Sequence, residues 1–118
     1  MTVRGVFASA NETRELSAGD VVFQAGDSGA HMYGVVSGSV ELRDGDVVVA
    51  TLGPDSTFGE LAIISKEPRS LTAVAAEDTT VALIDVRTFI FLVHETPTFA
   101  LQVMRSLAGR IKQLDHER

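Results

Sequence analysis

The stretch M-Y-G-V-V-S-G-S-V-E-L-R-D-G-D-V-V-V-A, residues 32–50, contains the pattern that decides the fold. It holds three short runs rich in β-branched and other apolar residues, separated by pairs that end in glycine. Asp44-Gly45 lies between the second and third runs, and this dipeptide favours a two-residue hairpin because both of its positions tolerate positive φ. We therefore expect short β-strands here, the last two of them joined as a hairpin.

The same pattern of β-rich runs and glycine turns extends over residues 19–85, and such spacing is typical of a small jelly roll or barrel. We expect a mainly β fold with C-terminal helices. It would be a double-stranded β-helix (jelly-roll) barrel with a short inserted helix and a final helical segment that serves as a lid or dimer contact. We assign residues 1–118 to a single domain, with the barrel at about 15–85 and the C-terminal helices at about 86–115. The expected strands are residues 21–24, 32–36, 39–43, 46–50, 72–76 and 80–85.

After Asp85 the apolar residues recur at helical spacing. Asp85 is expected to N-cap a short helix through Val93, and Thr96-Pro97 is typical of an N-cap followed by proline at the first helical position. Along the final helix, apolar residues recur at three- and four-residue steps, and part of this stripe follows a heptad spacing. The stripe either packs on the barrel or pairs with its copy in a homodimer. The seam proposed for the homodimer is Met104, Leu107, Ile111 and Leu114.

Composition limits the class of protein before any site is considered. The chain has 118 residues, of which 45% are hydrophobic, and this suits one packed domain. Ten Lys and Arg residues stand against 16 Asp and Glu residues, a net charge of -6 at pH 7, whereas nucleic-acid-binding proteins are usually basic. We therefore expect no nucleic-acid partner. Because there is no cysteine, no apolar run of membrane-span length and no secretory-signal pattern, we also expect a cytoplasmic protein without a membrane span.

The charged residues around one apolar run carry the functional information. Residues 57–73 read T-F-G-E-L-A-I-I-S-K-E-P-R-S-L-T-A, with Glu60 at one end of the run and Arg69 and Ser70 at the other. A short helix at residues 61–65 would be anchored to the barrel by its apolar residues and would present free amides, which bind phosphate, at its start. Arg69 offers a planar fork and Ser70 a hydroxyl for phosphate oxygens, whereas ionised Glu60 suits a sugar hydroxyl. The pattern favours a ligand with a ribose and a phosphate; the alternative is a glycine turn with solvated side chains or a surface ion pair.

This stretch resembles the phosphate-binding cassette of cyclic nucleotide-binding domains. The pattern of that family is roughly F-G-E-[LI]-A, a few apolar residues and then P-R-[AST]-A-T, and residues 58–75 read F-G-E-L-A-I-I-S-K-E-P-R-S-L-T-A-V-A. Upstream, residues 17–42 contain the G-D-x-G and Y-x-[VI]-x-x-G turns of the family. Downstream, V-A-L-I-D and a helix pair broken by Pro97 also agree, so the resemblance covers about residues 15–114.

The resemblance implies a role for each residue that matches the cassette. Glu60 binds the ribose 2′-hydroxyl, Arg69 binds the exocyclic oxygens of the cyclic phosphate, and Ser70 touches the phosphate. A threonine after the cassette arginine tends to favour cyclic GMP in this family, so Ser70 favours cyclic AMP. Two residues depart from the pattern: Leu71 replaces a small alanine, and Leu114 stands where some members place a polar residue against the base. The ligand-binding residues implied are Phe58, Gly59, Glu60, Leu61, Ala62, Arg69, Ser70, Leu71 and Thr72, with Leu114 as a base or lid contact.

We also expect a sensor that is not an enzyme and that needs neither a metal nor a cofactor. Ligand would close the cassette and move the C-terminal helix about a hinge near Thr96-Pro97. One alternative is a degenerate domain that keeps the fold and acts only as a protein-interaction or dimer module. A cupin-like metal enzyme is a further alternative, although the three histidines lie in different elements without the spacing of metal ligands. Because the chain ends shortly after the final helix, we expect no DNA-binding domain and either a free-standing sensor or an excised module.

Overall fold

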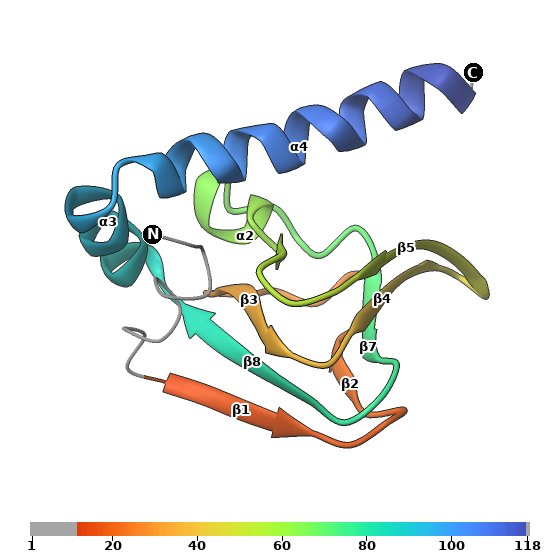
Figure 1. Ribbon diagram of the computed structural model, residues 1–118. Helices are drawn as coiled ribbons and strands as arrows, with labels where there is room; N and C mark the ends of the chain where they lie inside the picture. The colour runs from red at the N-terminus through yellow and green to blue at the C-terminus, as the bar shows by residue number, and fades with distance from the viewer. Residues whose placement is uncertain (1–11, 118) are drawn as a thin grey trace.

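Two four-stranded antiparallel sheets form the body of the molecule (Figure 1). The structure, a computed structural model, describes residues 12–117 and the side chains of residues 12–109. The first sheet has the order β1 (Glu12–Leu16), β8 (Thr79–Ile84), β3 (Met32–Ser37) and β6 (Thr57–Phe58). The second has the order β2 (Val21–Phe23), β7 (Thr72–Ala75), β4 (Val40–Asp44) and β5 (Val47–Leu52).

The β4–β5 hairpin confirms the strongest local prediction. Asp44 pairs with Val47 across the turn, and Gly45 has a φ of 61°, which glycine adopts without a steric penalty. A register shift between Leu42 and Arg43 marks a β-bulge, which increases the local twist. Together the two sheets and the C-terminal helices form the expected jelly-roll fold.

Two strands are present that the sequence pattern does not indicate. In β1 only Leu16 is buried, so the strand lacks the alternation of apolar and polar residues that would predict it. β6 has only two residues, and it pairs with Tyr33 and Gly34 of β3. Both strands depend on pairing with a distant strand, which local sequence does not encode.

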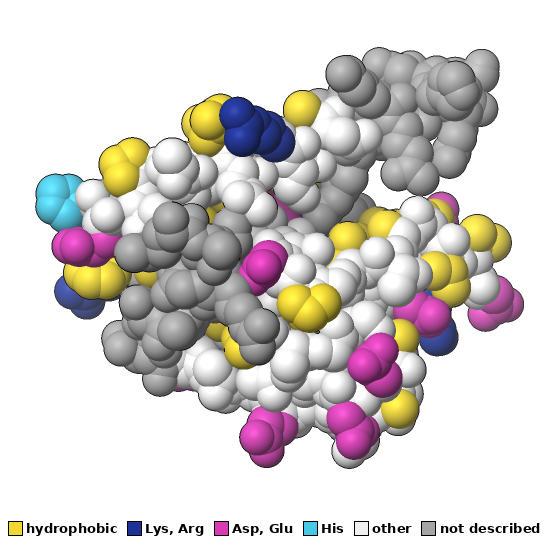
Figure 2. Space-filling view, viewed as in Figure 1, with side chains coloured by type: hydrophobic (Ala, Val, Ile, Leu, Met, Phe, Trp, Pro, Cys, Tyr) yellow, Lys and Arg dark blue, Asp and Glu magenta, His cyan; other side chains and the backbone are white. Residues whose placement is uncertain are grey.

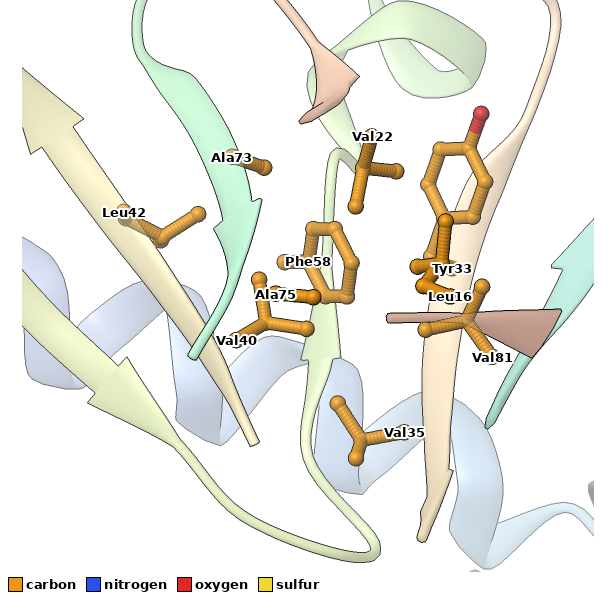
Figure 3. Close-up of a cluster of buried hydrophobic side chains, with 10 residues drawn as sticks. All are labelled: Leu16, Val22, Tyr33, Val35, Val40, Leu42, Phe58, Ala73, Ala75 and Val81. Atoms are coloured by element: carbon orange, nitrogen blue, oxygen red, sulfur yellow. The ribbon is translucent and has the colours of Figure 1, made fainter. Parts of the chain in front are cut away.

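Side chains from both sheets converge on one hydrophobic cluster (Figure 3). Phe58 is fully buried there and stacks on Tyr33 with a centroid distance of 5.2 Å. Phe23 packs against both rings at 5.8 and 5.9 Å. Such offset aromatic contacts add to the stability that burial alone provides. The cluster therefore fixes the strand that leads into residues 59–62.

Three helices are found in the described part of the chain: α2 (Leu61–Ile64), α3 (Val86–Glu95) and α4 (Thr98–Glu117). The carboxylate of Asp85 accepts the amide of Thr88 at 2.7 Å, which confirms the predicted N-cap. α3 ends at Glu95, two residues later than expected, and α4 begins just after Thr96-Pro97. In Figure 1, α4 crosses one end of the barrel above α2.

The apolar stripe of α4 is divided between two faces. Phe99 and Val103 are buried in a second cluster with Met32, Ile84 and Leu92, and Leu107 and Ile63 pack against it. Met104 is instead 61% exposed, so it does not share the buried face of its neighbours. The side chains of Ile111 and Leu114 lie outside the described residues. Packing on the barrel thus explains one part of the stripe, and Met104 belongs to the outward part.

Among the charged side chains on the face seen in Figure 2, acidic ones predominate, in keeping with the net charge. Apolar side chains also gather over the β4–β5 hairpin, where Val47, Val48 and Val49 are exposed. Within residues 12–117, no helix is long and apolar enough to cross a membrane.

Candidate functional site

The cassette segment runs from β6 through α2 to β7, and the fully buried Phe58 anchors its start in the barrel. Gly59 follows with a φ of 77°, a conformation that turns the chain and that L side chains rarely adopt. In α2 only Ala62 is buried, while Leu61 is 42% exposed and Ile64 is also exposed. The expectation that the apolar residues of this run anchor the helix to the barrel is therefore wrong for Leu61 and Ile64. Four residues of helix offer too little area to bury every apolar position.

Arg69 lies in a socket formed mainly by the backbone. Its Nη1 donates to the carbonyl of Gly59 at 2.9 Å, and its Nη2 donates to the carbonyl of His31 at 2.7 Å. The guanidinium carbon lies 4.1 Å from the centroid of the Phe23 ring, within the range of a cation–π contact. The side chain is only 7% exposed, and its Nε has no hydrogen-bond partner among the described residues. The socket thus holds a planar cation whose Nε–H is a buried donor available to a further acceptor.

Burial and nearby charge act in opposite directions on Arg69. Burial lowers the pKa of the guanidinium below its ordinary value, and interactions with Tyr33, Asp27 and Glu60 oppose this change. An arginine stays protonated despite such a shift. Glu60 is 1% exposed, so the side chains of Glu60 and Arg69 are both buried. An additional anion beside Arg69 would offset the cost of removing this cation from water.

The turn between β2 and β3 is tied to Arg69 along its backbone. The amide of Gly26 donates to the Arg69 carbonyl at 2.7 Å, and the amide of Arg69 donates to the Asp27 carbonyl at 2.8 Å. Thr72 adds a contact, since its hydroxyl accepts the amide of Ala25 at 3.0 Å. The part that this turn plays in the site was missed, because the G-D-S-G sequence indicates only a turn. Its contacts with residue 69 span more than forty positions of the chain.

The remaining predicted residues are placed as follows. Ser70 is exposed beside Arg69, and Leu71 is half-buried against the barrel cluster of Figure 3, where it packs as a core residue. Leu114 lies in α4, but its side chain lies outside the described residues. The structure therefore gathers Gly59, Glu60 and Arg69 at one place, with Phe58 beneath them in the core.

A cavity of about 330 Å³ lies between the cassette and the start of α3. Its lining comes from residues 28–30, from Ala62 and Ile63, from residues 66–68 and from Val86. Of the predicted ligand-binding residues, only Ala62 reaches it. Among residues 12–109, no three His, Asp or Glu side chains gather in a way that could hold a metal ion. Those residues supply no ligand set for the cupin-like alternative.

Comparison with known proteins gives consistent matches. A sequence model of the cyclic nucleotide-binding domain matches residues 13–96. The chain is 41% identical over 78 residues to a cAMP-dependent protein kinase regulatory subunit of Eremothecium gossypii, covering 66% of this chain and 17% of that protein. The crystal structure of Thermus thermophilus catabolite activator protein has a TM-score of 0.81 and 30% identity, over 98% of this chain and 56% of that one.

A third match is a solved structure from work on a cyclic-GMP-dependent signalling pathway that regulates bacterial phytopathogenesis. It has a TM-score of 0.77 and 32% identity, and the match covers 92% of this chain and 90% of that chain. The chain therefore spans a small part of the kinase subunit, about half of the catabolite activator protein and most of this third protein.

Proposed function

Because the chain belongs to the cyclic nucleotide-binding domain family, we propose that it binds a cyclic nucleotide and acts as a small regulatory sensor domain. One observation carries the proposal: the guanidinium of Arg69 is held in a backbone socket with a buried Nε–H that has no partner among the described residues. A phosphate oxygen is a suitable acceptor for that donor, and charge-assisted hydrogen bonds are stronger than neutral ones. Ser70, exposed beside it, offers a hydroxyl to the same group.

In this proposal the two buried charged side chains bind different parts of the ligand. In this proposal Arg69 takes the cyclic phosphate together with the backbone of Gly59, Leu61 and Ala62, and Glu60 accepts the ribose 2′-hydroxyl. The carboxylate attracts Arg69 and so helps to hold the guanidinium in place before ligand arrives. Neither the phosphate nor the ribose distinguishes one base from another.

Of the two cyclic nucleotides, we favour cyclic AMP as the ligand. The residue after the cassette arginine is Ser70, whereas threonine at this position tends to favour cyclic GMP in the family. The matching kinase regulatory subunit is named for cyclic AMP. Cyclic GMP is the second candidate, because a structural neighbour at 32% identity comes from a cyclic-GMP-dependent pathway.

Ligand binding would close the cassette and shift α4 about the hinge at Thr96-Pro97. Ile63 of α2 packs on the cluster that holds α4, so a movement of the cassette would reach that helix directly. The change is a population shift, which requires that the nucleotide binds the closed state more tightly than the open one. The exposed Met104 is available for pairing of α4 with a second copy, so we propose that the same movement can alter a dimer.

Calorimetric titration with cyclic AMP and with cyclic GMP tests the proposal, on protein first shown to be free of co-purified nucleotide. Arg69→Ala should weaken binding about 10- to 100-fold, since hydrogen bonds to charged groups contribute roughly 1.5–3 kcal/mol. Arg14→Ala is the matched control, because it removes the same charge from an exposed position on β1. If neither nucleotide produces heat at high micromolar concentration, the degenerate-domain alternative replaces this proposal.

A further inference from the structure

Gly29 lies beside the guanidinium of Arg69, and its backbone conformation does not require a glycine. Its φ lies outside the left-handed region, unlike that of Gly59. A Cβ built on Gly29 would lie 2.5 Å from Cζ and 2.6 Å from Nε of Arg69, and nearer still to Nη2. A Cβ atom essentially never comes this close to another heavy atom, so a side chain at position 29 and the observed position of the guanidinium exclude each other.

We propose that Gly29 is a positioning residue for the anion site: the space left by its missing side chain is the space in which Arg69 is held. The expected effect on nucleotide binding rests on the proposed function. The effect of Gly29 on the position of Arg69 does not, because that position is a property of the ligand-free protein. The carbonyl of His31, two residues along the same turn, accepts from Nη2. The turn therefore supplies both the space for the guanidinium and one of its acceptors.

The structure separates this role from a role in folding. The atoms that a methyl group at position 29 would meet belong to the far end of a flexible side chain, and the end of such a side chain moves at small cost. Arg69 can rotate towards solvent and keep its charge hydrated. We therefore expect Gly29→Ala to fold and to lose the socket geometry: Nη1 would leave Gly59, Nη2 would leave His31, and the ring contact with Phe23 would be lost.

Two measurements on the same three proteins test the inference. The first is the NMR chemical shift of the Arg69 Nε–H in the ligand-free protein. The signal is assigned by its absence from Arg69→Lys, and the ring current of Phe23 displaces it from its usual position. The second is calorimetric titration with cyclic AMP and cyclic GMP. The proteins are the wild type, Gly29→Ala and Gly53→Ala. Gly53 is the matched control because its φ is also ordinary and an added Cβ there meets nothing within 4 Å.

We expect Gly29→Ala to lose the displaced signal and to bind nucleotide about 10- to 100-fold more weakly, with Gly53→Ala unchanged in both respects. An unchanged Arg69 signal in Gly29→Ala would overturn the inference, as would wild-type affinity. If the wild type binds no nucleotide while Gly29→Ala still loses the signal displaced by Phe23, the positioning role stands and the proposed function fails. Should Gly29→Ala not fold, Gly29→Ala/Arg69→Ala must fold, since the methyl group then has room; failure of that double variant also overturns the inference.

Discussion

Truncation of Phe99 should loosen the attachment of the C-terminal helix more than any exposed substitution in it. Phe99 is 1% exposed, its ring lies 5.7 Å from that of Phe89, and it belongs to the cluster that joins α4 to β3 and β8. Val103, one turn later, is also buried. The side chain thus fills a space bounded by two helices and a sheet, and such a space cannot collapse easily when the ring is removed.

The expected cost follows from this burial. A fully buried phenylalanine replaced by alanine typically costs about 3–5 kcal/mol, as lost transfer free energy plus a cavity. Small domains have a total unfolding free energy of about 5–15 kcal/mol, so Phe99→Ala should remove a large fraction of it. Leu101→Ala, two residues along the same helix but 44% exposed, should change the free energy by about 0.5 kcal/mol or less.

Urea unfolding followed by circular dichroism measures both variants against the wild type at one protein concentration. Phe99→Ala should shift the midpoint strongly and Leu101→Ala hardly at all, with similar slopes if both unfold in one step. A new early transition in Phe99→Ala would show that the helices detach while the barrel persists. Equal costs for the two variants would refute the assignment of the buried face, and with it the proposed coupling from cassette to α4.

Three further predictions concern the cap, the ribose contact and the dimer. Asp85→Ala should cost about 0.5–2 kcal/mol at neutral pH, because its carboxylate accepts the Thr88 amide at the start of α3. That bond holds the pKa of Asp85 below its ordinary value. The contribution of Asp85 to the free energy of unfolding is therefore complete above about pH 5 and fades as the pH falls through the folded-state pKa. Unfolding curves of the variant and the wild type should converge in acid. Glu60→Gln should weaken cyclic AMP binding by roughly tenfold or more in calorimetry but leave its 2′-deoxy analogue unaffected, and equal losses would contradict the ribose contact. Light scattering should find a dimer that Met104→Asp converts to monomer; a monomeric wild type at high concentration would exclude this contact.

Local signals predicted the parts of the fold that depend on neighbouring residues. Asp44-Gly45 fixes its hairpin, and Asp85 caps its helix, because in each case the partners lie within a few positions. Phe99 was not predicted as a core residue, since it precedes the regular part of the stripe and its burial depends on β3 and β8. The stripe placed Met104 beside Val103 as equally apolar, and only packing against the barrel decides which of the two turns inward.

The candidate site shows the same division. The cassette pattern identified Glu60 and Arg69, but it contained no sign that the acceptors of the guanidinium would be carbonyls of Gly59 and His31. Any residue type carries a carbonyl, so sequence does not specify this contact. Gly29 did have a signal, as the second glycine of G-D-S-G, but a glycine in a turn is ordinarily explained by its backbone freedom.

The opposite charges at the two ends of the cassette are therefore best understood through the cost of burying them. Arg69 is withdrawn from water, and the partners of its two Nη groups are neutral carbonyls, whose hydrogen bonds compensate a buried cation only in part. The lowered pKa of Arg69 expresses that remaining cost, and the attraction of Asp27 and Glu60 reduces it without removing it. A phosphate that accepts from Nε would bring the missing negative charge to a cation already fixed in orientation. Binding would then gain the electrostatic attraction without the entropy cost of ordering a free arginine, which is why the socket, rather than the charge alone, should set the affinity.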